Sequence, residues 1–268
     1  MRPPSPFLLL AAGLCLVAAP AMATAACRAD SGTMRKVLLE LYTSEGCDSC
    51  PPADRRLSSY KDGGDTTGRL VPLAFHVDYW DRLGWTDRYA SPRYTQRQYE
   101  MAALARSRSV YTPQFLRNGR DWRSAAGPLD GLGNAPAGAT ITLELGPAVG
   151  RQLAVGGTIR VAGSGREVWL ALYENNLESR VQAGENAGKV LRHDYVVRHL
   201  IGPLPPDTDG RLSLRQLIPL DPGWKRADLG IVAFVQDKTS GEIVQALQRH
   251  ACPDRATSRA DGAGGAAA

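Results

Sequence analysis

Eleven residues organise this sequence: Tyr42-Thr43-Ser44-Glu45-Gly46-Cys47-Asp48-Ser49-Cys50-Pro51-Pro52. An apolar run from Val37 to Tyr42 precedes the two cysteines, and a mixed polar and apolar segment from Ala53 to Tyr60 follows them. This order predicts a strand, a tight turn with a Cys-x-x-Cys motif, and a helix. Two thiols at this spacing can form a disulfide or remain a dithiol. Their position between a strand and a helix is typical of a thioredoxin-like redox motif.

The N-terminal residues 1–25 have the pattern of a secretory signal peptide. Arg2 gives a positive start, residues 7–19 are apolar, and small-residue cleavage sites follow in residues 21–25. A retained N-terminal anchor is the alternative. No later segment is apolar for long enough to cross a bilayer. We therefore expect a bacterial protein that is periplasmic or secreted and is cleaved near residues 23–26.

The mature chain keeps four cysteines, an even number in an exported protein, where disulfides persist. We predict that Cys47 pairs with Cys50, and that Cys27 pairs with Cys252 and ties the two ends of the chain together. Lipidation of Cys27 is an alternative, because residues 24–27 partly resemble a lipobox. The 32 Lys and Arg and the 27 Asp and Glu are scattered along the chain. This pattern excludes a nucleic-acid-binding stripe and a membrane-binding helix.

A second predicted strand, Leu70–His76, leads into a loop that is rich in aromatic residues, among them Trp80 and Trp85. We interpret this loop either as a packed satellite core or as a rim around the thiols that contacts substrate. A helix follows, with Pro92 at its first position, and we expect it to end near Ala105.

A further key segment places Thr112 and Pro113 before a short apolar strand that an Asn118-Gly119 hairpin turn closes. In thioredoxin-like folds a cis-proline at this place faces the Cys-x-x-Cys turn, and the residue before it offers backbone groups to an extended substrate. We therefore predict that the Thr112–Pro113 bond is cis and lies against the turn of Cys47 and Cys50.

Beyond a linker at residues 134–138, apolar residues recur with a period of two. Short strands separated by Gly, Pro and Asp turns indicate an antiparallel sandwich. The predicted fold class is an α/β thioredoxin-like domain (33–135) followed by an all-β antiparallel sandwich-like domain (139–252) and a disordered tail (254–268). The candidate strands of the second domain are Thr140–Leu145, Thr158–Gly163, Val168–Glu174, Leu191–Leu200, Leu212–Leu217, Leu229–Gln236 and Glu242–Leu247.

Four blocks of the sequence resemble a family of secreted bacterial thioredoxin-like proteins that is known only as a domain of unknown function. The resemblance implies a thioredoxin-like domain followed by a β domain outside the cytoplasm, and it implies no reaction. The family commonly has Gln where this chain has Glu45. The blocks are residues 40–54, residues 76–81 with Gly84-Trp85, residues 111–114, and Gly184-Glu185-Asn186 with His193 and Val196-Val197-Arg198.

The first functional hypothesis is a thiol-disulfide oxidoreductase that acts on protein thiols or on a redox partner protein and needs no cofactor. Cys47 would be the exposed nucleophile, and Cys50 would resolve the mixed disulfide. Thr112 and Pro113 would hold the substrate backbone. Glu40 would either move protons for Cys50 from a buried position or lie at an edge with its carboxylate in water.

Two other classes of function remain open. A Cu(I)-binding or delivery module would use Cys47, Cys50 and His76 as soft ligands, although His76 is equally suited to be a base or a structural residue. A non-catalytic binding module would keep the Cys47–Cys50 bond as a permanent staple. Stoichiometric binding of Cu(I) by the reduced protein would distinguish the copper module from the other two.

The charges beside Cys47 predict a thiol that is less acidic than that of a strong oxidant. Asp48 and Glu45 disfavour a thiolate at this position. The two prolines are expected to delay the helix until about Pro52, so that the helix dipole acts less on Cys47. We therefore predict a Cys47 pKa closer to that of thioredoxin than to that of a strong oxidant.

Overall fold

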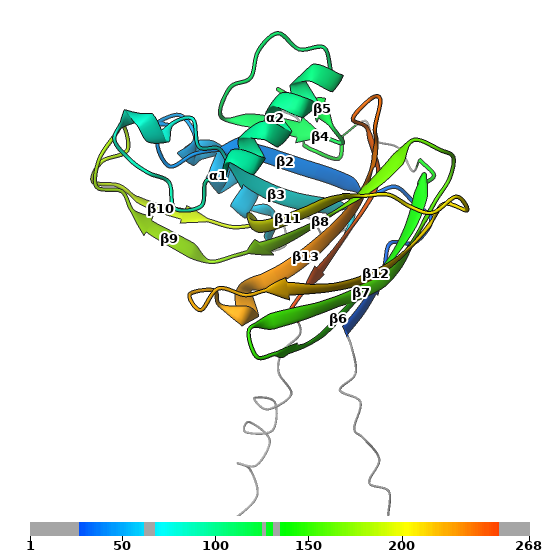
Figure 1. The fold of residues 1–268 in the computed structure, drawn as a ribbon. Coiled ribbons are helices and arrows are strands. Elements are labelled where there is room, and N and C mark those ends of the chain that lie inside the picture. Colours follow the sequence, from blue (N-terminus) through cyan, green and yellow to red (C-terminus); the bar gives the residue numbers. More distant parts are fainter. Residues whose placement is uncertain (1–26, 62–67, 125–126, 131–134, 252–268) are drawn as a thin grey trace, which may run out of the picture.

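The computed structural model describes residues 27–61, 68–124, 127–130 and 135–251. These residues form two α-helices and, for the most part, strands in three sheets (Figure 1). The helices are α1 (Pro51–Ser58) and α2 (Pro92–Leu104). The strands are β1 (Cys27–Asp30), β2 (Val37–Thr43), β3 (Leu70–His76), β4 (Gln114–Arg117), β5 (Arg120–Asp121), β6 (Ala139–Val149), β7 (Gln152–Val161), β8 (Arg166–Glu174), β9 (Leu177–Arg180), β10 (Val190–His193), β11 (Val196–Leu204), β12 (Arg211–Pro219), β13 (Leu229–Asp237) and β14 (Ile243–His250).

Local signals place the elements around the cysteine turn much as the sequence predicts. β2 is buried along its whole length, as its apolar run requires. α1 begins at Pro51 rather than Pro52, because Cys50 adopts helical backbone angles (φ −76°, ψ −37°) as the N-cap of α1. α2 begins at Pro92, and the Ser91 hydroxyl accepts a hydrogen bond from the Arg93 N–H at 3.3 Å.

The predicted fold class, an α/β thioredoxin-like domain followed by an all-β sandwich-like domain, is wrong. The described residues are mostly β, and one eight-stranded sheet, in the order β14-β13-β8-β11-β3-β2-β4-β5, takes strands from both predicted regions (Figure 1). β11 makes the junction, because it lies parallel to β3, with Val196 opposite Ala74, and antiparallel to β8. Backbone pairing is thus continuous from the cysteine segment to the C-terminal strands.

The predicted strand Leu191–Leu200 is divided into β10 and β11 by a break at Asp194 and Tyr195. Tyr195 has a left-handed backbone (φ 58°), which interrupts the extended chain, and its N–H donates to Asn175 Oδ1 at 2.8 Å. β10 then pairs with β9 in a separate two-stranded sheet beside α1 (Figure 1). This break brings His193, at the end of β10, into the neighbourhood of the cysteines.

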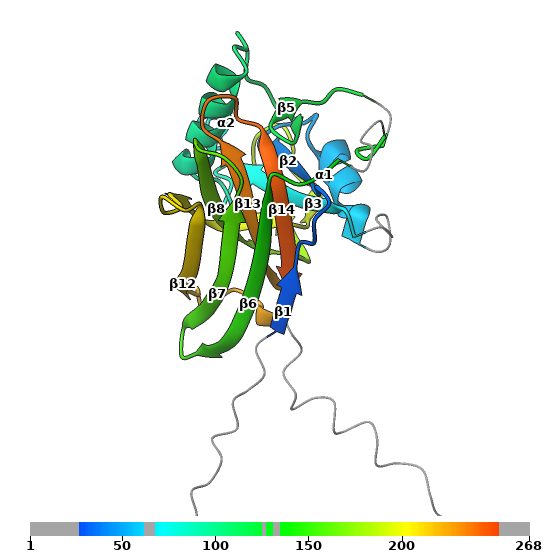
Figure 2. The same cartoon turned by 90° about the vertical axis from the view of Figure 1, so that its right-hand side faces the viewer.

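A second sheet, in the order β1-β6-β7-β12, packs against one face of the eight-stranded sheet (Figure 2). Leu170 and Ile231 point into the core between the two sheets, whereas Tyr173 and Phe234 belong to the core on the helix side. Strands β8 and β13 are therefore apolar on both faces. No helix among the described residues is long and apolar enough to cross a membrane.

Candidate functional site

Cys47 and Cys50 form a disulfide, as predicted, in the turn between β2 and α1. Their Cα atoms are 5.4 Å apart. The turn is tight, since the Cys47 N–H donates to Ser44 O at 3.2 Å and the Cys50 N–H donates to Cys47 O at 3.3 Å. The predicted partner of Cys27, Cys252, lies outside the described residues, as do the predicted signal peptide and the tail.

The disulfide is covered, and the prediction that Cys47 is exposed is wrong. Both cysteines are 0% exposed, whereas Asp48 and Ser49 between them face solvent. Trp80 lies close against the turn, because a Cβ added to Gly46 would come within 3.0 Å of Trp80 Cβ. A glycine at position 46 thus lets the aromatic loop close over the cysteine turn.

The loop between β9 and β10, residues 181–189, holds the cysteine turn from another side. The buried Asn186 amide donates to Glu45 O and to Cys47 O, both at 2.8 Å. The Asp48 N–H donates to Glu185 Oε2 at 3.1 Å. Nothing in the sequence alone indicated this contact, although Glu185 and Asn186 belong to the fourth block of the family resemblance.

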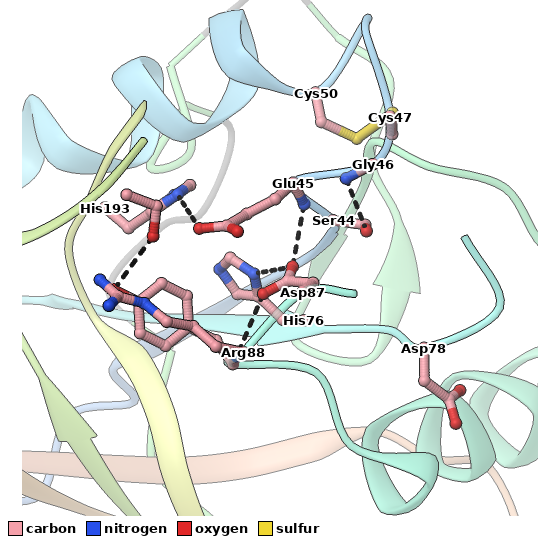
Figure 3. A network of polar contacts seen from close by, with 12 residues as sticks. Ser44, Glu45, Gly46, Cys47, Cys50, His76, Asp78, Asp87, Arg88 and His193 are labelled. Atoms are coloured by element: carbon pink, nitrogen blue, oxygen red, sulfur yellow. Dashed lines mark hydrogen bonds and ion pairs between the residues drawn. A yellow bond between two sulfur atoms is a disulfide. The ribbon is translucent and has the colours of Figure 1, made fainter. Parts of the chain in front are cut away.

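Beneath the turn lies a buried acid–imidazole cluster, which consists of Glu45, Asp54, His76, Asp87 and His193. His76 Nδ1 lies 2.6 Å from Asp87 Oδ2. His193 Nε2 lies 3.4 Å from Glu45 Oε1, and its Nδ1 lies 3.8 Å from Asp54 Oδ2. In Figure 3 the Glu45 and His193 side chains point towards each other, with His76 and Asp87 beside them. The two imidazole rings meet edge to face, with centroids 4.9 Å apart.

Burial and close contacts shift the pKa values of these acids and bases in different directions. Burial opposes the charged form of His76, but the neighbouring Asp87 carboxylate raises its pKa overall. Burial likewise opposes the charged form of Asp87, yet His76 lowers its pKa, so these two residues form a charged pair. The pKa of Glu45 is lowered against burial by hydrogen bonds, chiefly with His193. Burial raises the pKa of Asp54, which favours its protonated form.

The aromatic loop lies against the cysteine turn, and two of its tryptophans donate side-chain hydrogen bonds. Trp85 Nε1 donates to Glu45 Oε2 at 2.8 Å, so Trp85 contacts the acid–imidazole cluster. Trp80 Nε1 donates to Thr112 Oγ1 at 2.8 Å, and Trp80 thereby links the cysteine turn to the Thr112–Pro113 segment. The predicted cis bond between Thr112 and Pro113 is confirmed. A role of these residues in substrate binding stays a prediction.

Glu40 is buried outside the acid–imidazole cluster and has its own set of contacts. It is 0% exposed, so the alternative of an edge carboxylate in water is wrong. Arg97 Nε and Nη2 each lie 2.8 Å from Glu40 Oε1, and the Tyr42 hydroxyl donates to the same oxygen at 3.4 Å. The guanidinium also donates to Gln236 Oε1 at 3.1 Å from both Nη atoms. The role of Glu40 as a proton relay for Cys50 stays a prediction.

The cluster was largely missed by reasoning from sequence. Asp54 and His193 lie in quoted blocks, but nothing in the sequence indicated that they meet, and Asp87 was only part of a loop. Among the described residues, no group of three or more His, Cys, Asp and Glu side chains is placed to hold a metal ion. The Cu(I) site was proposed to use the sulfurs of Cys47 and Cys50 together with His76. In this oxidised state the two sulfurs are bonded to each other.

Two solved structures resemble this fold. A crystal structure of a protein from Agrobacterium tumefaciens is 27% identical, with a TM-score of 0.56 over 82% of this chain and 96% of that chain. HBP35 of Porphyromonas gingivalis is 19% identical, with a TM-score of 0.62 over 82% of this chain and 76% of that chain, and this likeness shows the fold alone. None of the curated proteins compared with the chain matches it.

The family to which the chain belongs follows from its sequence over most of the described fold. A family model described as "Protein of unknown function (DUF1223)" matches residues 38–236, which extend from β2 to β13 and include every residue of the acid–imidazole cluster. The match spans well over half of the sequence. The chain therefore belongs to this family of proteins of unknown function, DUF1223.

Proposed function

We propose that the Cys47–Cys50 bond is a redox-active disulfide through which this protein exchanges electrons with protein thiols outside the cytoplasm. The observation that carries the proposal is the acid–imidazole cluster beneath the disulfide, with five buried titratable side chains. Burying such groups is costly, and perturbed titratable groups gather at functional sites. A disulfide that served only as a staple would need none of them.

The exchange step follows thiol-disulfide chemistry. A substrate thiolate attacks Cys47 Sγ, the Cys47–Cys50 bond breaks, and Cys50 leaves as a thiolate that takes up a proton. A second substrate thiolate then attacks the mixed disulfide and releases Cys47. The substrate dithiol is oxidised to a disulfide, and two electrons pass to the cysteine pair. The reverse sequence oxidises the pair.

Asp54 is the best-placed proton donor for Cys50. It follows Cys50 by four residues, so both side chains lie on one face of the first turn of α1. Its N–H donates to Cys50 O at 3.1 Å. Burial raises the pKa of Asp54, which favours the protonated carboxyl group that a proton donor needs.

Exchange requires that the buried disulfide becomes accessible, and we expect the loop 181–189 to control this because Asn186 bonds to the cysteine turn. The Asn186→Ala change removes two hydrogen bonds to the cysteine turn. Such bonds contribute roughly 0.5–1.5 kcal/mol each, so we expect dithiothreitol to reduce the disulfide about tenfold faster. Thiol alkylation followed by mass spectrometry measures the rate. Gln182→Ala, an exposed change in the same loop, should leave it unaltered. Equal rates in Asn186→Ala and the unsubstituted protein would exclude this loop as the cover.

The reduction potential of the pair tests the proposed function. The start of α1 offers little to a Cys47 thiolate, because Pro51 and Pro52 lack an N–H and the Ala53 N–H donates to Cys50 O at 2.9 Å. We therefore expect a potential near that of thioredoxin, about −270 mV, in equilibrium with dithiothreitol. A Cys47 pKa below about 5 in a thiolate titration would contradict this expectation.

The burial of both cysteines favours one competing function, a binding module with a permanent staple. A structural disulfide resists reduction, with a potential below about −300 mV. If the measured potential lies in that range and the reduced chain unfolds, the staple is the better explanation and the redox proposal fails.

A further inference from the structure

A groove with a volume of about 530 Å³ lies apart from the disulfide, where the start of α2 meets β11. Residues 88–91, Arg93 and Tyr94 line one side and residues 197–202 line the other, with Trp224 as a further wall. Tyr89 separates the groove from the acid–imidazole cluster, because it lines the groove and also contacts the rings of His76 and His193 at centroid distances of 5.4 and 5.7 Å.

The groove is cationic. Arg88, Arg93 and Arg198 line it, and no acidic residue is among its lining residues. It also contains the N-terminus of the 13-residue helix α2, which carries partial positive charge. Burial and the charge of Arg93 lower the pKa of His199, which also lines the groove. Such surroundings favour an anion over a neutral or cationic ligand.

The arginines keep hydrogen-bonding capacity for a ligand. Arg93 Nη2 donates to Gly202 O at 2.6 Å, and Arg88 donates to Glu178 O. Arg198 Nε lies 3.5 Å from Glu174 Oε2, which offsets part of its charge, but Arg198 Nη1 is buried with no hydrogen-bond partner. A guanidinium has five N–H donors in a planar fork that matches a carboxylate or a phosphate.

The remaining walls are apolar and aromatic. The Arg198 guanidinium lies between two rings, 5.0 Å from the centroid of Tyr89 and 5.2 Å from that of Trp224. Tyr94 and Ile201 add further apolar surface. The volume falls within the range of sites for small molecules, which combine aromatic walls with a few polar groups.

We propose that this groove binds a small organic anion, with a carboxylate or phosphate held by Arg93 and Arg198 and a planar apolar body packed against the partly exposed Ile201 and Trp224. The site is separate from the disulfide, so its occupancy does not depend on the redox function proposed above. The anionic group gives the specificity, because a neutral ligand would make no charge-assisted hydrogen bond with the arginines, and the ring adds contact area.

Calorimetric titration of the oxidised full chain with phenyl phosphate, benzoate and the neutral benzamide tests the proposal. We expect the two anions to bind at least tenfold more tightly than benzamide, and the tighter of the two identifies the preferred head group. Equal affinity for benzamide would overturn the proposal. Inorganic phosphate that binds as tightly as phenyl phosphate would exclude the aromatic contact and with it the proposed ligand class.

Substitutions locate the binding. Arg198→Gln and Arg93→Gln should each weaken phenyl phosphate binding at least tenfold, whereas Arg180→Gln, an exposed change on β9, should leave it unchanged. Arg198 pairs with the buried Glu174, so its replacement can affect folding. Arg93 is exposed and its guanidinium bonds to a backbone carbonyl, so its replacement should leave the fold intact. If Arg198→Gln fails to fold, Arg93→Gln therefore decides the test. Unchanged affinity in Arg93→Gln would overturn the proposal.

Discussion

Replacing Arg97 with alanine is expected to lower the free energy of unfolding by about 3–5 kcal/mol, because the change leaves a buried carboxylate without its partner. Arg97 is 2% exposed and Glu40 is 0% exposed. The change also removes the hydrogen bonds to Gln236 and the contacts of the guanidinium with the rings of Trp169 and Phe234, at 5.2 and 4.9 Å. Urea denaturation followed by circular dichroism measures the loss.

Two control variants separate the buried charge from the loss of packing. The double change Glu40→Met with Arg97→Met should recover most of the stability, because apolar side chains of similar size often replace a buried ion pair without loss. Arg28→Ala removes an exposed partner of Glu144 and should cost less than about 1 kcal/mol. A loss in Arg97→Ala as small as that in Arg28→Ala would show that Glu40 is not held by this pair.

The same contact explains why the fold class could not be predicted. Arg97 on α2 binds Glu40 on β2 and Gln236 on β13, and Gln236 is 139 residues away along the chain. Periodicity and capping are local, so they placed β3 at its observed bounds and started α2 at Pro92. They carry no information on which distant strands pair. The pairing of β3 with β11 in one sheet could therefore not be predicted from local patterns, and two separate domains were the simpler inference.

In the candidate site, too, features that depend on short motifs were predicted, whereas features that depend on distant contacts were not. The disulfide and the cis bond before Pro113 follow from short motifs and were predicted. The burial of Cys47 was not predicted, and the Asn186 amide that bonds to Cys47 O lies 139 residues further along the chain. Glu45 was identified only as an extra acid beside Cys47. Its pairing with His193 requires the break in the chain before β11, which no local pattern indicated.

The acid–imidazole cluster provides a physical reason why the two cysteines should differ in their roles. Asp54, whose pKa burial raises, lies on the helix that Cys50 caps, whereas Ser49 Oγ lies 3.4 Å from Cys47 Sγ. A protonated acid near Cys50 favours its departure as a thiol. In the proposed exchange, Cys47 then remains as the sulfur that carries the substrate. The assignment of Cys47 as nucleophile and Cys50 as resolving residue therefore makes a clear prediction for single substitutions.

Replacing Cys50 with serine is expected to abolish turnover and to trap Cys47 in a stable mixed disulfide. Without Cys50 no internal thiolate can attack the mixed disulfide, so the intermediate persists. Incubation with oxidised glutathione, followed by mass spectrometry of the intact protein, should show one bound glutathione on Cys50→Ser. Reduction of a peptide disulfide should fall to the uncatalysed rate in both Cys50→Ser and Cys47→Ser.

The reciprocal variant provides the control, because Cys47→Ser should form much less of the mixed disulfide if Cys47 is the residue that meets substrate. Burial by the loop 181–189 can hide the reaction, so both variants are also made with Asn186→Ala, which removes the two hydrogen bonds that hold the cysteine turn. Equal trapping at Cys47 and Cys50 would reject the division of roles. An absence of trapping even with Asn186→Ala would mean that neither sulfur exchanges with thiols, and the Cys47–Cys50 bond would then be a structural staple.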